Sequence, residues 1–527
     1  MKILITDKLD ESAVEYLLER NFEVEQHFGA KPEELMGLAS GVHGWIIRSG
    51  TRLTEELLST ATDLKVVGRA GVGVDNIDIQ SATRLGIAVL NTPSGNTIAA
   101  VEHSMALLLS LARHIPQAHY SLKHQGLWER SQFTGVELCG KTIGILGLGK
   151  IGGRVAMRCQ ALEMKVVGFD PYLSAERARE MGITLIEDLA ELLGRCDFIS
   201  LHLPSTENTR GIIGAESLAQ CKPGIRIVNC ARGNLVDELA LAHALQSGQV
   251  AGAALDVFQQ EPPAERALLD SNNLIVTPHL GASTVEAQRN VGTQIAEQVA
   301  DALDNGIFRE AVNIPVQDWS SYSKLKPQID LVERLGQTAQ QYCGGGISAV
   351  DLDYEGESFK EVEAMNNAFL TGLLRPVVGE GVNSVNAPVL AEERGVTLRF
   401  NREDASSDYQ MLVRVQVTAD GRQHELAGTI FSDNEPRLVG IDGFSVELFL
   451  FGVLLIFGNS DKPGVIGNVG ELLGRYDINI AHFSLGRSEV GGDALGIVAV
   501  DERISDTALS ELGAIENMRW VTQIELA

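Results

Sequence analysis

The stretch Thr142-Ile143-Gly144-Ile145-Leu146-Gly147-Leu148-Gly149-Lys150-Ile151-Gly152 decides how the central part of this chain folds. Its first five residues are largely apolar and indicate a buried strand, and a helical pattern follows the last glycine. The G-x-G-x-x-G pattern allows a tight turn, lets the backbone approach a pyrophosphate, and lets helix and strand pack closely. The helix N-terminus adds partial positive charge for phosphates. We therefore expect a dinucleotide-binding fold that holds its cofactor at Gly147, Gly149 and Gly152.

Asp170 indicates which dinucleotide is bound. It follows the next predicted strand, Lys165–Phe169, at about the distance from the glycine pattern where an acidic residue contacts the adenosine ribose. Its carboxylate can accept hydrogen bonds from the ribose hydroxyls, whereas it would repel a 2′-phosphate. The sequence therefore predicts NAD rather than NADP as the cofactor.

Short apolar runs alternate with helical patterns through the N-terminal half of the chain. Such alternation is typical of βαβ units and predicts parallel sheets. The runs form two series, so we expect an α/β fold with two Rossmann-like or flavodoxin-like parallel-sheet domains. The predicted strands are Lys2–Thr6, Gly44–Ile47, Leu64–Val67 and Ile87–Leu90, then Thr142–Leu146, Lys165–Phe169, Phe198–His202, Ile225–Asn229, Ala253–Val257 and Leu274–Thr277.

Three ionisable residues, Arg232, Glu261 and His279, each follow a predicted strand of the second series. Ligands of open parallel sheets bind beyond the carboxyl ends of the strands, so these side chains should lie at the edge that holds the dinucleotide. A fixed cation, a carboxylate and a group that exchanges protons near neutral pH suit proton-coupled chemistry. Each residue alone could be an ordinary turn, loop or structural residue, but three at one edge favour an active site.

The first series repeats this arrangement with cationic and amide groups. Arg48 and Arg69 follow two predicted strands, Gly71 exposes backbone N–H groups, and Asn96 comes after a third strand. Such groups suit an anionic ligand. The formal net charge is −27, so arginines at successive strand ends point to a local anion site. The alternative is that they are ordinary solvated turn arginines.

The overall composition excludes several classes of protein. A chain of 527 residues is too long for one core, and its acidic balance argues against sequence-independent nucleic-acid binding. Six cysteines without a CxxC pair argue against a disulfide framework or a zinc site, and we expect no metal. The N-terminus reads as a strand and not as a signal peptide, and the apolar run Leu448–Phe457 is too short to span a bilayer. A cytoplasmic protein is expected.

The C-terminal part has a different organisation. After Asn313-Ile314-Pro315 the sequence becomes more polar, and strand-like alternation in Tyr409–Val417 and His424–Ile430 predicts an α+β module. From about residue 451 the patterns run strand, helix, strand, strand, helix, strand. This order predicts a ferredoxin-like βαββαβ unit.

With these motifs the chain resembles the D-2-hydroxyacid dehydrogenases, and among them the long form that acts on 3-phosphoglycerate. Besides the glycine pattern, the resemblance rests on Asn229–Gly233, Asp256–Pro262 and Pro278–Ala282, and it extends to Val385–Pro388 and Asp461–Gly467. It implies NAD-dependent oxidation of 3-phospho-D-glycerate to 3-phosphohydroxypyruvate, the first step of L-serine biosynthesis, by a homodimer or homotetramer.

The resemblance also implies a role for each matching residue. His279 would exchange the proton of the C2 hydroxyl, Glu261 would hold the imidazole and favour its charged form, and Arg232 would clamp the substrate carboxylate and carbonyl oxygen. Substrate contacts would come from Arg48, Arg69, Gly71 and Asn96, and from Arg130 of a neighbouring subunit. In addition to the three glycines and Asp170, the cofactor would be lined by Val72, Lys150, Ile151, Leu203, Pro204, Cys230, Ala231, Asp256, His279, Gly281 and Ala282.

Four domains are implied in the same way: a substrate-binding domain of residues 1–97 plus 290–313, an NAD-binding Rossmann domain of residues 98–289, an intervening regulatory domain of residues 314–450, and an ACT domain of residues 451–527. ACT domains pair and bind amino acids at their interface, so L-serine feedback is expected, with Asn459, Asp461 and Asn479 at the effector positions. The lead-in Leu454–Asn459 is apolar where several relatives are polar, which leaves serine regulation open.

Three other functions stay open from the sequence alone. Another D-2-hydroxyacid dehydrogenase, of the glycerate or hydroxypyruvate type, would share the N-terminal motifs, but such relatives mostly lack the C-terminal extension. A non-catalytic NAD-sensing scaffold would have no need for the set Arg232, Glu261 and His279. An amino-acid-binding regulatory protein would account only for the C-terminal part.

Overall fold

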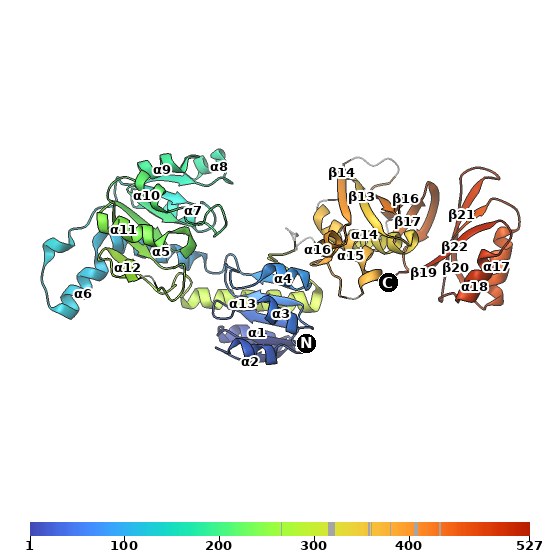
Figure 1. Cartoon of the computed structure of the whole chain (residues 1–527), viewed down its shortest axis with the longest axis horizontal. Helices are drawn as coiled ribbons and strands as arrows, with labels where there is room; N and C mark the ends of the chain where they lie inside the picture. Colours follow the sequence, from blue (N-terminus) through green and yellow to red (C-terminus); the bar gives the residue numbers. More distant parts are fainter. Residues whose placement is uncertain are drawn as a thin grey trace.

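The computed structural model describes residues 1–264, 266–314, 322–356, 359, 361–379, 381–404, 409–431 and 434–526, apart from the side chains of residues 322–324. Four sheets follow one another along an elongated molecule, and the C-terminal sheet lies at the end opposite the sheet that carries the glycine pattern (Figure 1). Two parallel sheets are followed by a mixed sheet and an antiparallel one, so the predicted α/β architecture with α+β and ferredoxin-like additions is confirmed.

The first sheet has five parallel strands in the order β2-β1-β3-β4-β5. The sequence predicts that Arg69 follows its strand, which is wrong, because Arg69 is the last residue of β4. The sequence also misses β2, an edge strand whose residues are polar except for Val24 and of which none is fully buried. The elements are β1 (Lys2–Ile5), α1 (Glu11–Glu19), β2 (Glu23–Gln26), α2 (Pro32–Leu38), β3 (Gly44–Ile47), α3 (Glu55–Thr60), β4 (Val66–Arg69), α4 (Ile79–Arg84) and β5 (Ala88–Asn91).

The second sheet has seven parallel strands in the order β12-β11-β10-β9-β6-β7-β8. The order of the strands reverses between β6 and β9, and such a switch point is where open α/β sheets bind ligands. Its elements are α5 (Thr97–Arg113), α6 (Ile115–Gln125), η1 (Arg130–Phe133), β6 (Thr142–Leu146), α7 (Gly152–Ala161), β7 (Lys165–Phe169), α8 (Ala175–Glu180), β8 (Thr184–Leu185), α9 (Leu189–Arg195), β9 (Phe198–Leu201), α10 (Ala215–Gln220), β10 (Ile225–Asn229), η2 (Gly233–Leu235), α11 (Glu238–Ser247), β11 (Val250–Leu255), α12 (Arg266–Leu269) and β12 (Leu274–Val276).

Helix α13 (Val285–Asn305) returns the chain from the second sheet to the first. It packs against α1 and against β3, β4 and β5 (Figure 1). Its buried residues Val291, Ile295 and Val299 belong to the same apolar core as Ile3 and Ile5 of β1. The two parallel sheets are therefore joined by two chain crossings, one at the start of α5 and one at α13.

The third sheet has the order β14-β13-β15-β16-β17-β18, and only the β13–β14 pair is parallel. Both predicted strands of this module are present, with ends shifted by a few residues. Helices α14 and α15 pack closely on each other, and α14 also covers the sheet. The elements are α14 (Tyr322–Cys343), β13 (Ile347–Glu355), α15 (Val362–Val378), α16 (Ala387–Glu393), β14 (Thr397–Glu403), β15 (Leu412–Ala419), β16 (Arg422–Ile430), β17 (Pro436–Ile441) and β18 (Phe444–Phe449).

The C-terminal sheet is antiparallel, with the order β20-β21-β19-β22. Its element order confirms the predicted βαββαβ unit. The central strand β19 is buried from Leu454 to Phe457, which explains why this segment is so apolar. The elements are β19 (Gly452–Ser460), α17 (Val465–Arg475), β20 (Ile480–Arg487), β21 (Asp493–Val500), α18 (Asp506–Gly513) and β22 (Met518–Leu526).

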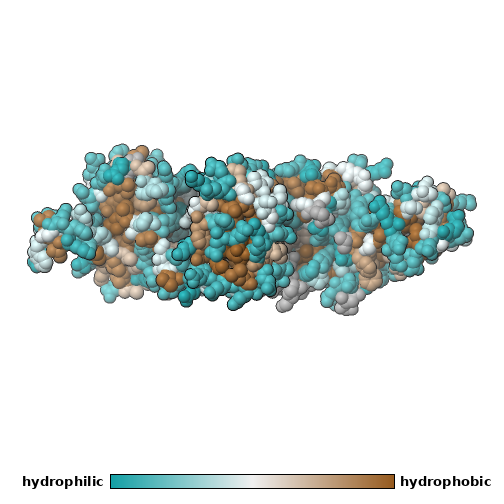
Figure 2. Space-filling model, turned by 90° about the horizontal axis from the view of Figure 1, so that it is seen from below, coloured by the Kyte–Doolittle hydropathy of each residue, from teal (hydrophilic) through white to brown (hydrophobic). Residues whose placement is uncertain are grey.

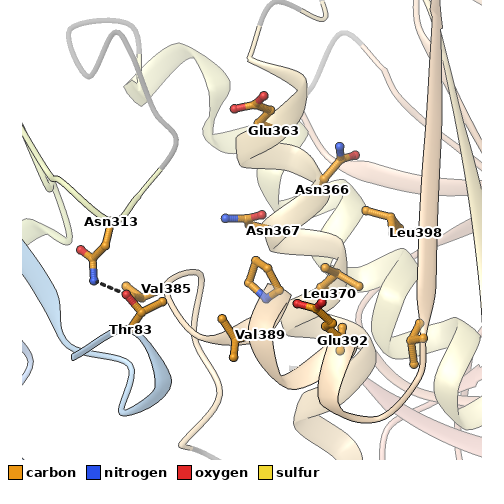
Figure 3. A pocket seen from close by; sticks show the side chains of 13 residues that line it. Thr83, Asn313, Glu363, Asn366, Asn367, Leu370, Val385, Val389, Glu392 and Leu398 are labelled. Carbon is orange, nitrogen blue, oxygen red and sulfur yellow. Dashed lines mark hydrogen bonds between the residues drawn. The ribbon is translucent and has the colours of Figure 1, made fainter. Parts of the chain in front are cut away.

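The first and third sheets meet through the segment before α16. Asn383 donates a hydrogen bond from Nδ2 to the Gly86 carbonyl at 2.9 Å, and Val385 enters the core of the first sheet. Beside this contact, a cavity of about 480 Å³ separates α15 from Asn313, whose Nδ2 donates to Thr83 Oγ1 (Figure 3). The intervening module thus contacts the N-terminal sheet through a hydrogen bond from Asn383 and through the buried side chain of Val385.

The surface is largely hydrophilic, with separate apolar patches on the face that Figure 2 shows. Within the described part of the chain, no helix combines the length and the apolar composition that a membrane span needs.

Candidate active site

The glycine loop between β6 and α7 has the shape that a bound pyrophosphate requires. A Cβ on Gly147, whose φ is +90°, would meet the His202 carbonyl oxygen, and a Cβ on Gly152 would overlap the Gly147 carbonyl. Contacts within the protein therefore leave no room for a side chain at Gly147 or Gly152. Gly149 differs, because a Cβ there would meet nothing within 4 Å. The open space above its backbone at a helix N-terminus fits a phosphate group of a dinucleotide.

Asp170 lies directly beside this loop. Its Oδ2 accepts a hydrogen bond from the Leu148 N–H at 2.8 Å, and its Oδ1 accepts one from the Tyr172 N–H at 3.0 Å. The carboxylate is therefore fixed in place and keeps lone pairs for hydroxyl donors. It also borders a cavity of about 320 Å³ that reaches Leu185 and Glu187. This cavity can hold the adenosine half of NAD, and Glu187 is a neighbour that the sequence reasoning missed.

The other predicted cofactor positions gather at the same edge. Leu203 follows β9 and packs beside Gly147, while Cys230 and Ala231 follow β10, the next strand. Burial raises the pKa of the Cys230 thiol to about 12, so it acts as a neutral lining group. Pro204 is exposed beyond Leu203. Lys150 lies in the glycine loop, directly before Ile151, the N-cap residue of α7. Its Nζ reaches the loop after the last strand of the first sheet and donates to Ser94 Oγ at 2.7 Å.

A cleft of about 490 Å³ lies between the carboxyl ends of the two parallel sheets and brings together both sets of predicted residues. Its lining also includes residues that the sequence did not single out, among them Asp75, Asn76 and Phe258. Nine predicted residues line it: Arg48, Arg69, Gly71, Val72, Asn96, Arg232, Glu261, His279 and Ala282.

His279 and Glu261 form a hydrogen-bonded pair at this cleft. The distance from His279 Nδ1 to Glu261 Oε2 is 2.8 Å, and the other carboxylate oxygen, Oε1, accepts from the Phe258 N–H at 3.2 Å. His279 has a φ of +55°, in the left-handed region. The carboxylate fixes the ring through Nδ1 and leaves Nε2 as the nitrogen that can exchange a proton.

Arg232 leaves the end of β10 and turns toward the first sheet. Its Nε donates to Asp75 Oδ2 at 3.0 Å, and its Nη1 donates to the Ala231 carbonyl at 2.7 Å. Arg232 is thus held across the cleft by a carboxylate from the other sheet. The sequence reasoning missed Asp75, because a single aspartate in a glycine-rich loop carries no spacing pattern that marks it.

Arg69 is the most deeply placed cation of the cleft. Burial, together with the positive charges of Arg232 and Arg48, lowers its pKa to about 10. Its Nε is buried without a hydrogen-bond partner among the described residues, and so is Oδ1 of Asn96, the N-cap residue of α5. The three cations and the unpaired Arg69 Nε–H suit an anionic ligand, whereas Asn96 Oδ1 is an acceptor that suits a hydroxyl donor.

Asp256 lies just beyond β11 and is fully buried. Its Oδ1 accepts from Thr277 Oγ1 at 2.6 Å and from the Leu280 N–H at 2.7 Å, and its Oδ2 accepts from the Gly281 N–H at 2.8 Å. Burial alone would raise its pKa, but these hydrogen bonds and the His103 ring outweigh burial, and the pKa is lowered. Asp256 therefore acts as an ionised anchor for the turn that carries His279 and Gly281.

Comparisons with known proteins agree with this geometry. Residues 105–281 match the family described as D-isomer specific 2-hydroxyacid dehydrogenase, NAD binding domain. Residues 324–442 match the D-3-phosphoglycerate dehydrogenase intervening domain, and residues 453–517 match the ACT domain. The D-3-phosphoglycerate dehydrogenase of Methanocaldococcus jannaschii is 42% identical over 527 residues and covers 100% of both chains. The enzyme of that name from Bacillus subtilis is 40% identical, over 100% of this chain and 99% of its own.

The chain belongs to the D-3-phosphoglycerate dehydrogenase family.

Solved structures match the part that contains both parallel sheets. The TT0316 protein of Thermus thermophilus is 33% identical with a TM-score of 0.55, over 59% of this chain and 100% of its own. The D-lactate dehydrogenase of Aquifex aeolicus, solved with NAD and lactic acid, is 29% identical with a TM-score of 0.52, over 59% of this chain and 98% of its own. The predicted NAD cofactor and oxidoreductase class are confirmed by these family matches.

Arg130 lies outside the cleft of its own chain. It begins η1, the next element after helix α6, which projects from the rest of the molecule (Figure 1). Arg130 borders a separate cavity of about 260 Å³ with Leu127, Trp128 and Phe133. The side chain of Trp128 is 76% exposed. A phosphoglycerate dehydrogenase active site that used Arg130 would therefore need the Arg130 of another subunit.

The predicted effector residues do not form one site in a single chain. Asn459 and Asp461 lie at the end of β19, where the Asp461 carboxylate accepts from the Gly491 N–H at 3.0 Å. Asn479 lies at the opposite end of the sheet, because β20 pairs its first residue, Ile480, with Val500, whereas Asn459 pairs with Ala494. The ACT match indicates a small amino-acid effector. A site that used all three side chains would have to combine two chains.

Among the residues that the structure describes, no group of three or more His, Cys, Asp or Glu side chains is arranged so that it could hold a metal ion.

Proposed function

We propose that this protein oxidises 3-phospho-D-glycerate to 3-phosphohydroxypyruvate with NAD, the entry step to L-serine. The observation that carries the proposal is that one cleft is lined both by the His279–Glu261 pair and by Arg48, Arg69 and Arg232. Three arginines in one pocket of a protein with a net charge of −27 suit a substrate with both a carboxylate and a phosphate.

His279 is the acid–base group of the proposed reaction. Glu261 accepts from Nδ1–H, so Nε2 carries the free lone pair and takes the proton of the C2 hydroxyl as the carbonyl forms. The imidazolium that results is stabilised by the adjacent carboxylate of Glu261. NAD, when bound at the glycine loop and Asp170, supplies the acceptor for the hydride that leaves C2. In the reverse direction, His279 returns its proton to the carbonyl oxygen.

Arg232 positions the carboxylate end of the substrate. Its guanidinium is rooted at the end of β10, and its contacts with Asp75 and Ala231 fix its direction before a substrate arrives. Because the guanidinium group of Arg232 is already oriented, less entropy is lost when the substrate is aligned for hydride transfer from C2. Because Asp75 is largely exposed, a substrate carboxylate can share the guanidinium with it.

Arg48 and Arg69 provide the positive charge for the phosphate end, and the partner subunit's Arg130 completes it. Helix α6 and the segment after it present exposed apolar side chains that a second copy of the chain would bury. These are Ile115, Tyr120, Leu122, Leu127 and Trp128. The active form is therefore a homodimer, or a homotetramer built from it.

Three further assignments belong to this proposal. The chain divides into residues 1–97 plus 290–313 for substrate, 98–289 for NAD, 314–450 as the intervening domain and 451–527 as the ACT domain. L-serine is the effector, bound between two ACT domains at Asn459 and Asp461 of one chain and Asn479 of the other. The protein works in the cytoplasm, which agrees with the six free cysteines.

Reduction of NAD by the purified protein with 3-phospho-D-glycerate or D-glycerate tests the proposal. Turnover with the phosphorylated acid and little with D-glycerate is expected. Preference for D-glycerate would point to the glycerate-type dehydrogenase, and binding of NAD without turnover of either acid would point to the scaffold.

A further inference from the structure

His103 has no role in the reaction described so far, yet it contacts the anchor of the catalytic turn. It lies on α5, and its side chain is 19% exposed. Its Nε2 is 3.1 Å from Thr277 Oγ1 and 3.1 Å from Asp256 Oδ1. One ring nitrogen therefore faces two oxygen atoms that themselves share a hydrogen bond.

The hydrogen bond between those two oxygens decides which group donates. Thr277 Oγ1 is 2.6 Å from Asp256 Oδ1, and an ionised carboxylate can only accept, so the single hydroxyl hydrogen of Thr277 points to Asp256. Toward His103, Thr277 can then act only as an acceptor. Both neighbours of Nε2 are acceptors, and Nε2 must carry a hydrogen. This holds for the neutral ring and for the charged ring.

Asp256 transmits this contact to the catalytic histidine. Its two carboxylate oxygens accept the N–H groups of Leu280 and Gly281, and its backbone carbonyl accepts the N–H of His279 at 2.9 Å. The turn thus depends on a carboxylate that accepts on both oxygens. Protonation of Asp256 would cost one of these hydrogen bonds, and a donor at His103 opposes that protonation.

Helix α5 also connects this network to the substrate cleft. Asn96, at the N-cap of α5, lines the cleft, and His103 lies seven residues later, two helical turns away on the same side of the helix. The helix packs on β10 and β11, the strands that end at Arg232 and Asp256.

We propose that His103 is a positioning residue: its Nε2–H holds Asp256 and Thr277 and so fixes the turn Pro278–Gly281 in the conformation that presents His279 to the substrate. The kinetic part of this inference rests on the proposed function, whereas the structural part does not. The other titratable groups near Asp256 are the Cys230 thiol, kept neutral by burial, and His279, whose ring faces Glu261.

Two substitutions separate donation by Nε2 from simple packing. His103→Gln keeps an N–H donor at a similar reach, and His103→Leu removes it. The exposed neighbour on α5, Glu102→Gln, is the matched control. Each variant is assayed in full-length form for turnover of the phosphorylated keto acid across pH, for NADH affinity by fluorescence, for melting temperature, and for hydrogen exchange of the peptide that spans residues 277–283.

His103→Leu should lower kcat about 10- to 100-fold, since misplacement of a catalytic group costs rate and not cofactor binding, and NADH affinity should stay within about threefold. On the acid side, its rate should begin to fall at a higher pH than in the wild type, because Asp256 loses a donor that keeps it ionised. Exchange in peptide 277–283 should rise in His103→Leu and stay at the wild-type level in His103→Gln, whose kcat should remain within about threefold.

Three results would overturn the proposal: an unchanged kcat in His103→Leu, an equal loss in His103→Gln, or a parallel loss of NADH affinity. If the wild-type protein does not reduce 3-phosphohydroxypyruvate, the proposed function fails, and the exchange experiment still decides whether His103 holds the turn.

Discussion

Glu261 accepts a hydrogen bond from Nδ1 of His279 at 2.8 Å, although the two residues come from loops after different strands of the parallel sheet. The bond decides which ring nitrogen faces the substrate cleft. With Nδ1 held by Glu261, Nε2 of His279 is the ring nitrogen that is available to accept a proton.

Replacement of His279 by Ala should lower kcat about 10²- to 10⁴-fold, the usual contribution of a general acid–base group. NADH affinity should change little, because the glycine loop and Asp170 hold the cofactor. Stopped-flow or steady-state assays combined with NADH fluorescence titration check both parts. Near-normal turnover would remove His279 from the mechanism.

Glu261→Gln should be less damaging than His279→Ala, since the amide still orients the ring but does not stabilise its charge. We expect kcat to fall about 10- to 100-fold while the Michaelis constant for the keto acid changes little. A loss confined to KM would mean that Glu261 acts on substrate binding.

Arg69→Leu should weaken substrate binding and raise the thermal stability of the fold. The folded protein holds Arg69 at a lowered pKa, because burial and the charges of Arg232 and Arg48 disfavour its charged form. A base with a folded pKa below its unfolded value destabilises the fold by a constant amount at all pH values below the folded pKa, and this cost falls only as pH rises above about 10 toward the unfolded pKa. At neutral pH the variant should therefore melt about 2 °C or more above wild type, while the Michaelis constant for the phosphorylated keto acid rises at least about tenfold. A lower melting temperature would contradict the electrostatic reading of this cleft.

Asp170→Ala should weaken NAD binding and improve the relative use of NADP, because the carboxylate repels a 2′-phosphate. Asp170→Asn is the control, since it removes the charge but keeps an acceptor for the Leu148 N–H. The ratio of kcat/KM for the two cofactors measures the effect. If neither variant shifts the ratio, cofactor choice is made elsewhere in the site.

A mixture of two impaired variants should regain activity if the partner subunit's Arg130 serves each active site. Arg130→Ala and His279→Ala chains should both be slow alone, whereas a mixed dimer has one site with His279 from one chain and Arg130 from the other. Activity after co-refolding or co-expression should exceed the sum of the separate variants. A simple average of the two would place Arg130 outside the active site.

The sequence predicts the parallel sheets and the strand-end residues well, because strand ends in parallel sheets converge by topology. Thr142–Leu146, Lys165–Phe169 and Ile225–Asn229 begin and end at the predicted residues. Arg69 is an exception, because its strand starts after Lys65 and runs two residues further than the apolar run suggests.

Contacts between distant segments could not be read from spacing. Asp75 contacts Arg232 from the other sheet. His103 contacts Asp256 from helix α5, whose mostly apolar sequence predicts only core packing. Within one chain, Arg130 and Asn479 lie far from the residues predicted to act with them. Spacing along the sequence gives no indication of this separation.

The most direct test of the central claim compares kcat/KM for 3-phosphohydroxypyruvate with kcat/KM for hydroxypyruvate, measured as NADH oxidation by the wild-type protein. An arginine cleft built for a phosphate predicts a preference of at least about 10³-fold for the phosphorylated keto acid, as expected when loss of one ligand group leaves buried charges unpaired. Equal values for the two keto acids would contradict the assignment and leave a general 2-hydroxyacid dehydrogenase.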